Sequence, residues 1–544
     1  MIAYITEFKA IKRILSVVLT LCILFALSAC KDNTEDKKPD GGKKPAVSTP
    51  ADSDTGSSTD ADSSEDSTPV VGTKFDVSES VIEYRSDYAE VRAENIQPNM
   101  YDPLVGYKDA EADAMREKIL NTGNTEEYYE ITGTKYYVSP GGNDENDGKS
   151  PETALRTIDA LLNVTLNPGD AVLFERGSIF RLSSTLELKE GVTYGSYGSG
   201  DKPQIYGSPF NYAAGDYWEP TKVRNVWKAE YLYEFIGCAV YNHGEIVGNL
   251  RYDPVKLKTN GDFYNAEKEG AVYIYCDKGN PSKAFESIEF AAGRTMLTGR
   301  GVGNYVVDNL CLKYGGFGVT SKGTKSNVYV TNCEMAYIGG YTGNGTARKG
   351  NAFEVGGNSD NIVVDNNWIY QIYDTAITWQ TDADYYKNIY FTNNLLEYNT
   401  MDIEYFSKDG CVVENVKTEG NLMRFTAAGW GCRASDAGTR NGAACVRGNT
   451  SNLKIKNISF TNNIVDCPRY FIFQLMNTPA QNNQMKFTNN TYYIKSSYRT
   501  SDVMISSFKM NDGDDFSDHK ATNASEFKSL FSYFDPNVNV YWYN

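Results

Sequence analysis

A repeated pattern of short β-type runs, each ending in Asn, constrains this sequence more than any other feature. The runs are Asn361–Asn367, Asn388–Asn394 and Asn415–Asn421, and each final Asn lies 27 residues after the one before. The pattern returns at Ile458–Asn463 and Met485–Asn490, again 27 residues apart. A fixed period of this size, built on short strands, indicates one supersecondary unit stacked on its neighbours. The sequence therefore predicts a parallel β-solenoid of about seven to ten coils.

The paired Asn residues that close these runs are expected to have a structural role. Asn side chains that stack in successive coils can hydrogen-bond to one another and to the backbone of the turn. We expect such a ladder at Asn366, Asn393, Asn462 and Asn489, together with the Asn that follows each.

The charge of the chain excludes some partners. Its 544 residues have a net charge of -17. Nucleic acid is an unfavourable partner for such a chain, because binding to phosphates requires a basic surface. The length sets no domain count, because each coil of a solenoid contacts only its neighbours. We expect a monomer.

The first 29 residues have the features of a targeting signal. Lys9, Lys12 and Arg13 precede the apolar run Ile14–Ala26, which is followed by Leu27–Cys30. This segment resembles a bacterial lipoprotein signal, and the resemblance implies cleavage before Cys30 and lipidation of its thiol. The expected location is extracytoplasmic, with the protein anchored to the bacterial cell envelope and touching the membrane only through the lipid on Cys30. An ordinary secretory signal or an N-terminal anchor is the alternative.

A helical segment and the cysteines indicate further local structure. Asp109–Leu120 carries Ala112, Met115 and Ile119 at helical spacing and predicts a helix that covers the N-terminal end of the stack. The cysteines show no C-x-x-C spacing, which argues against zinc. Cys432 and Cys445 flank one loop and are the candidate disulfide, while the other cysteines fit small buried hydrophobes.

The segment from Lys135 supplies a second clue to the fold. A strand and polar loop, Lys135–Gly148, lead to a helix with Ser150 as N-cap and Pro151 at its first position, and a turn and strand follow from Asn167. This opening resembles secreted right-handed parallel β-helix proteins of the pectate-lyase-like superfamily, which is rich in polysaccharide lyases and glycoside hydrolases. The resemblance covers roughly residues 135–495 and implies an all-β, right-handed parallel β-helix, but it leaves the reaction open.

The sequence divides into seven segments. A scarcity of apolar residues predicts a disordered tether after the signal, and patterns typical of β-hairpins predict a β-rich insertion into the β-helix. The segments are a signal peptide (1–29), the tether (30–74), an N-terminal cap (75–134), the first coils with a capping helix (135–210), the insertion (211–291), the main β-helix (292–495) and a C-terminal cap (496–544).

Alternation along the strands places candidate catalytic residues. Phasing of successive coils aligns three triplets centred on Glu354, Thr378 and Glu404, with their large apolar neighbours facing the core. Asp402 lies two residues before Glu404 and is expected on the same outer face. Paired carboxylates about 6.5–9.5 Å apart suit an inverting glycosidase. Asp402 and Glu404 are therefore the predicted pair, with Glu354 as a third candidate; solvated surface acids are the alternative.

Substrate-binding residues are predicted around this column. Thr378 and Gln380 lie beside the carboxylates, and Trp430 between two glycines suggests an exposed plane for sugar stacking. Arginines of the following coil and its loop, joined by one from an earlier coil, could clamp an acidic glycan or pair with surface acids. These are Arg348, Arg424, Arg433, Arg440 and Arg447.

No firm metal site or other cofactor is predicted. Asp374, Asp382 and Asp384 surround one strand and could bind calcium, although solvated turns are the alternative. The sequence thus favours a polysaccharide-active surface protein, with glycoside hydrolysis as the first hypothesis. The alternatives are β-elimination of a uronate polymer with Arg or Lys as base, and a non-catalytic glycan-binding protein.

Overall fold

The computed structural model describes residues 104–231, 235–343, 347–432, 443–448 and 452–544. The predicted signal, Cys30 and the tether lie outside the described residues, so the lipid anchor stays a prediction. None of the helices in the described part of the chain is long and apolar enough to cross a membrane.

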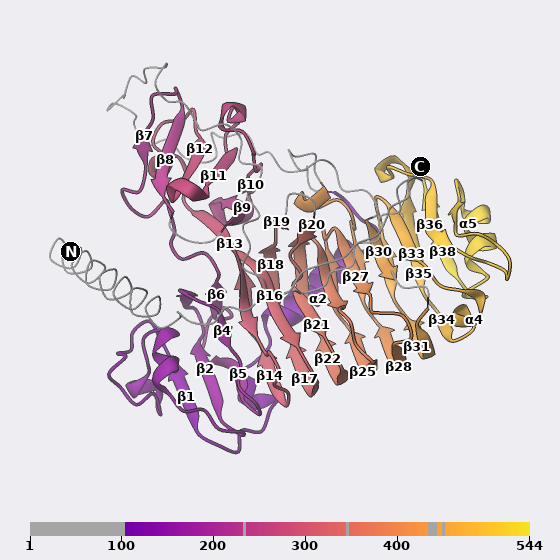
Figure 1. Cartoon of the computed structure of the whole chain (residues 1–544), viewed down its shortest axis with the longest axis horizontal. Helices are drawn as coiled ribbons and strands as arrows, with labels where there is room; N and C mark the ends of the chain where they lie inside the picture. The colour runs from indigo at the N-terminus through magenta and orange to yellow at the C-terminus, as the bar shows by residue number, and fades with distance from the viewer. Residues whose placement is uncertain (1–103, 232–234, 344–346, 433–442, 449–451) are drawn as a thin grey trace, which may run out of the picture. The chain divides into compact units, whose positions relative to one another are not determined.

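Three long sheets, named A, B and C here, make up the stack (Figure 1). Sheet A contains, in order, β1 (Lys135–Val138), β2 (Ala171–Glu175), β5 (Thr193–Tyr197), β14 (Tyr305–Asp308), β17 (Lys325–Thr331), β22 (Ser359–Asp365), β25 (Tyr385–Thr392), β28 (Val412–Glu419), β31 (Lys454–Thr461) and β34 (Met485–Thr488). Sheet B contains β3 (Ile179–Arg181), β6 (Gln204–Tyr206), β15 (Cys311–Lys313), β18 (Glu334–Ile338), β23 (Trp368–Ile372), β26 (Leu395–Glu397), β29 (Leu422–Arg424), β32 (Ile464–Asp466), β35 (Thr491–Lys495) and β38 (Asn539–Tyr543).

Sheet C completes each coil. It contains β10 (Ile246–Val247), β9 (Ile236–Tyr241), β13 (Ile288–Thr298), β16 (Gly315–Lys322), β21 (Phe353–Gly356), β24 (Thr375–Trp379), β27 (Met401–Tyr405), β30 (Ala444–Gly448), β33 (Phe471–Leu475), β36 (Val503–Phe508) and β37 (Ser517–Lys520), with β4 (Leu186–Glu187) paired to β13. One coil runs through β22, β23 and β24, and the next through β25, β26 and β27, with parallel pairing between them. The predicted right-handed parallel β-helix is confirmed, and the ten strands of sheet A agree with the predicted number of coils.

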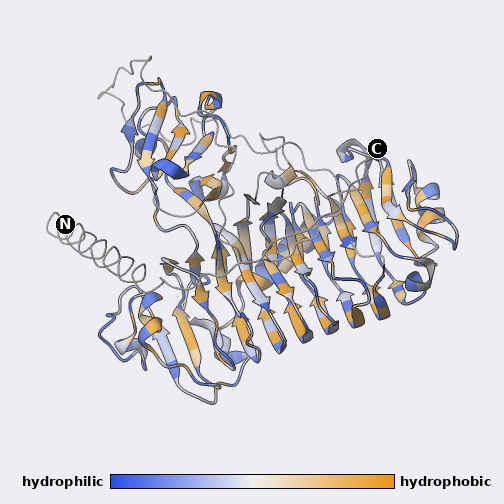
Figure 2. Cartoon of the chain, in the orientation of Figure 1, coloured by the Kyte–Doolittle hydropathy of each residue, from blue (hydrophilic) through white to orange (hydrophobic). Residues whose placement is uncertain are grey.

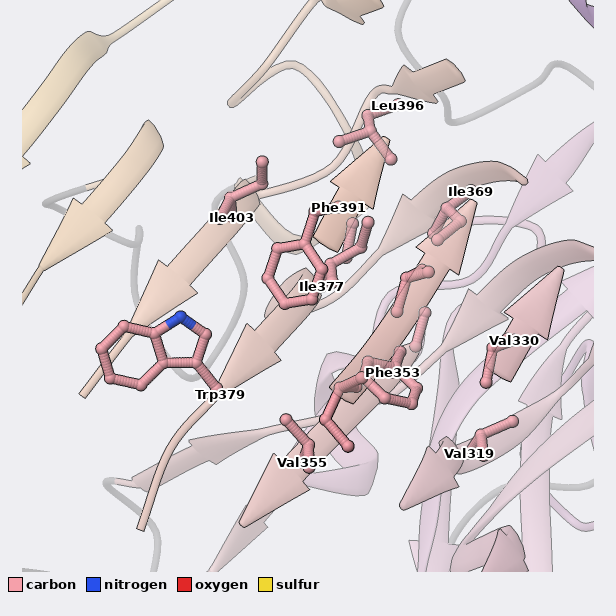
Figure 3. Close-up of a cluster of buried hydrophobic side chains, with 14 of the residues drawn as sticks. Val319, Val330, Phe353, Val355, Ile369, Ile377, Trp379, Phe391, Leu396 and Ile403 are labelled. Carbon is pink, nitrogen blue, oxygen red and sulfur yellow. The ribbon is translucent and has the colours of Figure 1, made fainter. Parts of the chain in front are cut away.

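The core lies between the three sheets. Phe353, Ile377 and Ile403 are register partners in successive strands of sheet C and are almost completely buried. Figure 3 shows these side chains in one cluster with Ile369 of sheet B and Phe391 of sheet A. Hydrophobic and hydrophilic residues alternate along many strands (Figure 2), as expected where one face of each strand is buried.

The paired Asn residues form the corners between sheets A and B. The first Asn of each pair, such as Asn366 and Asn393, has a positive φ of 55° and 54°, a conformation that Asn tolerates better than most residues. The second is buried and bonds to the next coil: Asn367 Nδ2 donates to Asn394 Oδ1, and Asn394 Nδ2 donates to Asn421 Oδ1, both at 3.0 Å. The predicted Asn ladder is confirmed, and its buried part is the second Asn.

Helix α2 (Asp109–Leu120) forms where predicted but lies elsewhere on the stack. Its buried Ala112 and Ile119 pack on Leu395 and Leu422 of sheet B, in the middle coils. The expectation that it covers the N-terminal end is wrong, because these outward apolar residues of sheet B provide its partner surface.

The N-terminal end is covered instead by the segment after β1. Ser150 is an N-cap, as predicted, but the expected helix is replaced by two short 3₁₀ turns, Pro151–Thr153 and Asp159–Asn163. Between them Leu155 forms a parallel bridge with Val138 and is buried in the core. Burial of this extended residue interrupts the helical pattern.

The C-terminal end is covered by α5 (Ala524–Phe531), which lies within the segment 496–544 that was predicted as a cap. Its Phe527 and Phe531 are buried in the main core beside Tyr492. The other two α-helices among the described residues are single turns, α3 (Pro281–Ala284) and α4 (Pro479–Asn482).

Antiparallel strands occupy much of residues 211–291. They include a separate four-stranded sheet of β11 (Phe263–Ala266), β12 (Ala271–Tyr275), β8 (Val226–Glu230) and β7 (Glu219–Pro220). A two-stranded hairpin, β19 (Tyr341–Gly343) and β20 (Ala347–Lys349), precedes β21.

The predicted disulfide between Cys432 and Cys445 is wrong. Cys432 and Cys445 do not form a disulfide with each other. Their thiols face different hydroxyl groups: Cys432 Sγ lies 3.6 Å from Thr400 Oγ1, and Cys445 Sγ lies 3.3 Å from Thr426 Oγ1.

Candidate functional site

The predicted column on sheet C exists in the register that the sequence indicated. Glu354 pairs with Thr378, Thr378 with Glu404, and Glu404 with Arg447 in four successive strands. The residues before and after each of Glu354, Thr378 and Glu404 belong to the core, so these three side chains lie on the outward face of their strands. The backbones of Glu354 and Glu404 are separated by two strand spacings, or about 10 Å.

A chain of hydrogen bonds joins the two glutamates. Asn351 Nδ2 donates to Glu354 Oε2 at 2.8 Å, and Asn351 Oδ1 accepts the Thr375 N–H at 3.1 Å. Thr375 Oγ1 then donates to Glu404 Oε2 at 3.2 Å. Asn351 and Thr375 were missed by sequence reasoning, although both lie at the start of strands whose phase was already known.

Each glutamate also faces a cation from a neighbouring strand. Lys322 Nζ lies 3.8 Å from Glu354 Oε1, and Arg447 Nη1 lies 3.6 Å from Glu404 Oε1. Glu354 is 4% exposed and Glu404 is 6% exposed, so the open surface face that was predicted for them is wrong. Hydrogen bonds and ion pairing compensate these buried charges.

Thr378 lies between the two glutamates and is unusual in its polar contacts. Its side chain is fully buried, and its Oγ1 has no hydrogen-bond partner among the residues that the structure describes. A buried hydroxyl without a partner is rare in proteins. The position therefore has unused hydrogen-bonding capacity at the centre of the column.

The prediction that Asp402 shares an open face with Glu404 is wrong. Asp402 is completely buried; Asn399 Nδ2 donates to its Oδ1 at 3.1 Å, and Thr426 Oγ1 donates to its Oδ2. Burial raises the pKa of Asp402 to about 8, although the two hydrogen bonds oppose the shift. The carboxyl lies beside a core residue, because Cys445 Sγ contacts the same Thr426 hydroxyl.

Arg424 is likewise unavailable as a clamp for an anionic substrate. It is 3% exposed; its Nη1 bonds to Glu397 Oε1 at 2.8 Å and its Nε bonds to Asp466 Oδ2 at 3.0 Å. Its Nη2 pairs with Asp109 at the start of α2. Sequence alone did not show that these three carboxylates would meet, because they come from separate elements.

Trp430 is not the exposed plane that was predicted. It is buried, its Nε1 donates to the Gln371 carbonyl at 2.8 Å, and its ring lies 4.7 Å from that of Tyr373. The flanking glycines serve close packing, because a Cβ at Gly429 would lie 1.7 Å from the Tyr398 carbonyl oxygen.

Of the remaining predicted binding residues, the structure describes some and not others. Gln380 is half-buried at the end of β24, where its carbonyl accepts from Tyr386 Oη at 2.8 Å. Arg348 belongs to β20. Arg433 and Arg440 lie outside the described residues.

The structure does not bring the three candidate calcium ligands together. Asp374 precedes β24, whereas Asp382 and Asp384 follow it, so the length of the strand separates them. Asp384 pairs with Lys408 at 2.8 Å. Within the described ranges, no group of three or more His, Cys, Asp or Glu residues is arranged to hold a metal ion.

The fold thus defines a right-handed parallel β-helix protein with a polar column along sheet C. No protein-family profile and no curated protein matches the chain. Among solved structures it is similar to a GH136 lacto-N-biosidase from Eubacterium ramulus, with 14% identity, a TM-score of 0.32 and coverage of 68% of this chain. The chain spans 65% of that lacto-N-biosidase.

Two other solved structures show similar relationships. A family 28 exopolygalacturonase from Yersinia enterocolitica is 16% identical with a TM-score of 0.35, and the match covers 69% of this chain and 68% of the other. The catalytic domain of a GH87 α-1,3-glucanase is 14% identical with a TM-score of 0.30, and the match covers 71% and 62%.

Proposed function

We propose that this protein binds a polysaccharide along the outer side of sheet C and hydrolyses a glycosidic bond between Glu354 and Glu404. The observation that carries the proposal is the pair of carboxylates in one column, linked through Asn351 and Thr375. Hydrolysis of a glycoside needs one carboxyl group to protonate the leaving oxygen and a second to activate water.

The spacing favours an inverting reaction. The glutamate backbones are about 10 Å apart, close to the upper end of the range of about 6.5–9.5 Å between carboxyl groups that accommodates a water molecule. A retaining enzyme needs about 5 Å, close to a single strand spacing. Thr378 occupies that intermediate coil, where its buried hydroxyl has unused capacity to hydrogen-bond to a water molecule.

The arrangement suits a linear polymer. The column follows the direction in which coils stack, so consecutive polar side chains repeat at the strand spacing of about 4.8 Å. It continues beyond the glutamates to Thr320 on one side and to Arg447 and Gln474 on the other. An extended chain on the outer side of sheet C would therefore meet side chains of several coils, of which Lys322 and Arg447 are the partly exposed ones.

Conservative removal of each carboxylate tests the proposal. We expect Glu354→Gln and Glu404→Gln each to lower the release of reducing ends from a panel of polysaccharides by about 10²–10⁴-fold. Glu414→Gln, a change of the same type on sheet A, is the control and should retain activity. Full turnover by both column variants would reject the assignment.

The burial of the glutamates favours a second candidate, a non-catalytic glycan-binding protein. Such a protein would retard a polysaccharide in a native gel without releasing reducing ends. The uronate-lyase alternative receives less support, because Lys322 and Arg447 lie within ion-pair distance of carboxylates. A lyase would also reveal itself through an unsaturated product that absorbs ultraviolet light.

A further inference from the structure

A cleft lies over sheet B, away from the column on sheet C. Its volume is 450 Å³, and its walls come from α2 and from strands and corners of the middle coils. This volume falls within the range of about 300–1,000 Å³ that is typical of small-molecule sites. The proposed hydrolysis makes no use of this cleft.

The inner wall is aromatic and fixed in position. Trp368 stacks on Tyr370 with ring centroids 4.2 Å apart, and its Nε1 donates to Glu397 Oε2 at 2.9 Å. Glu397 is held from its other side by Arg424 at 2.8 Å. These buried groups satisfy one another, so the wall offers a shaped surface with the rigidity that binding sites require.

The rim consists of three charged residues on one face of α2. Asp109 and Asp113 are separated by four positions and Asp113 and Arg116 by three, which places them next to each other on the helix. The side chains of Asp109 and Asp113 are 47% and 70% exposed. The Nε of Arg116 is buried and has no hydrogen-bond partner within the described part of the chain.

We propose that this cleft is a carbohydrate-binding site that takes one pyranose unit with vicinal hydroxyl groups. The hydroxyls donate to the carboxylates of Asp109 and Asp113. One of them accepts from an N–H that remains on Arg116 Nη1 or Nη2 beside their bonds to Asp113 and Glu397. The edges of the Trp368 and Tyr370 rings supply the apolar wall against the C–H groups of the sugar, because the Arg116 guanidinium lies over the Trp368 ring, 4.9 Å from its centroid.

The cleft is lined by both acidic and basic side chains, which favours a neutral sugar over a charged ligand. An anion would meet the carboxylates of Asp109, Asp113 and Glu397, and a cation would meet Arg116 and Arg424. A neutral polyol matches both kinds of group, because each hydroxyl is at once a donor and an acceptor. The proposal is independent of hydrolysis at Glu354 and Glu404.

The test is ligand-observed NMR on the folded protein with methyl glycosides of glucose, galactose, mannose and xylose as probes. We expect saturation transfer to at least one probe, and weakening of its binding by about tenfold or more in Asp113→Ala and in Arg116→Gln. Glu117→Gln, on an exposed position of the same helix, should leave the affinity unchanged. Thermal unfolding confirms that α2 remains docked in each variant.

The controls separate this site from the column. Glu404→Gln should retain probe binding even where it abolishes hydrolysis. The proposal is overturned if none of the four probes binds, if both cleft variants bind as well as the unaltered protein, or if binding is lost only in Glu404→Gln. Asp113 forms its ion pair with Arg116 within α2, so its removal tests the cleft even if Arg116→Gln proves unstable.

Discussion

Asp402 and Glu404 lie two residues apart in β27, yet different groups contact their carboxyl groups. Asp402 is enclosed by Asn399, Thr426 and core atoms, and no cation of the described residues bonds to it. Glu404 instead meets Thr375 and Arg447. A neutral carboxylic acid is the less costly form in the first environment, whereas the second provides charge compensation.

Asp402 should make stability depend on pH. Its folded pKa of about 8 lies above that of an unfolded Asp, so the unfolded chain loses its proton first as pH rises. This contribution to stability is complete below about pH 4 and is lost progressively up to about pH 8. Asp402→Asn keeps the side-chain volume but cannot ionise. We therefore expect it to remove this part of the pH dependence of the unfolding free energy, and to raise that free energy by a few kcal/mol at pH 8 relative to the unaltered protein.

Denaturant unfolding at pH 5 and pH 8 measures the effect. The exposed Asp512→Asn is the matched control and should keep the original slope. An unchanged slope in Asp402→Asn would show that Asp402 titrates equally in the folded and unfolded chains.

The corners between sheets A and B illustrate how single elements join the coils. Asn393 turns the backbone with φ of 54°, and the next residue, Asn394, enters the stack. Asn394 Nδ2 bonds to Asn421 Oδ1 and to the Val364 carbonyl, both at 3.0 Å. One residue thus shapes the turn and its neighbour links three coils, although both have the same side chain.

This division of roles predicts unequal effects of mutation. Asn394→Ala leaves buried partners unsatisfied and should cost about 2–4 kcal/mol of unfolding free energy. Asn393→Gly keeps the positive φ and loses one exposed bond to Asp365, so we expect a cost below about 1 kcal/mol. Urea unfolding midpoints compare the two variants, and equal costs would contradict the assignment of roles.

The whole molecule is stabilised by contacts between successive coils and by covers at its two ends. Leu155 and Ile158 cover the first coil, and Phe527 and Phe531 of α5 cover the last. In a solenoid, loss of an end cover acts first on the adjacent coils, because stability passes through nearest neighbours.

Removal of one ring from the C-terminal cover should therefore have a local effect. Phe527 is completely buried, and its ring lies 4.0 Å from that of Phe531 and 5.2 Å from that of Tyr492. We expect Phe527→Ala to cost about 3–5 kcal/mol and to lower hydrogen-exchange protection in β34, β35 and β36 before β2 and β5. Phe516→Ala, at a partly exposed ring, is the control. A uniform loss of protection would indicate a fully cooperative stack.

Much of the fold and part of the candidate site could be predicted from local pattern. Alternation placed Glu354, Thr378 and Glu404 in one register column, and the structure pairs them in that order. The same reasoning failed for Asp402 and Trp430, since strand parity does not reveal what covers a side chain. The glycines beside Trp430 suggested an exposed ring, but Gly429 allows the backbone to approach Tyr398 closely.

The sequence by itself determined the coils, because each repeat contains its own strands, Asn corner and apolar residues, and parallel stacking follows from these local features. Only the tertiary structure decided which polar groups meet. Arg424 is bound by acids from α2 and two strands, and the two glutamates are linked through Asn351 and Thr375. Such contacts join residues from different coils and elements, so their geometry depends on how the coils stack and on where α2 docks.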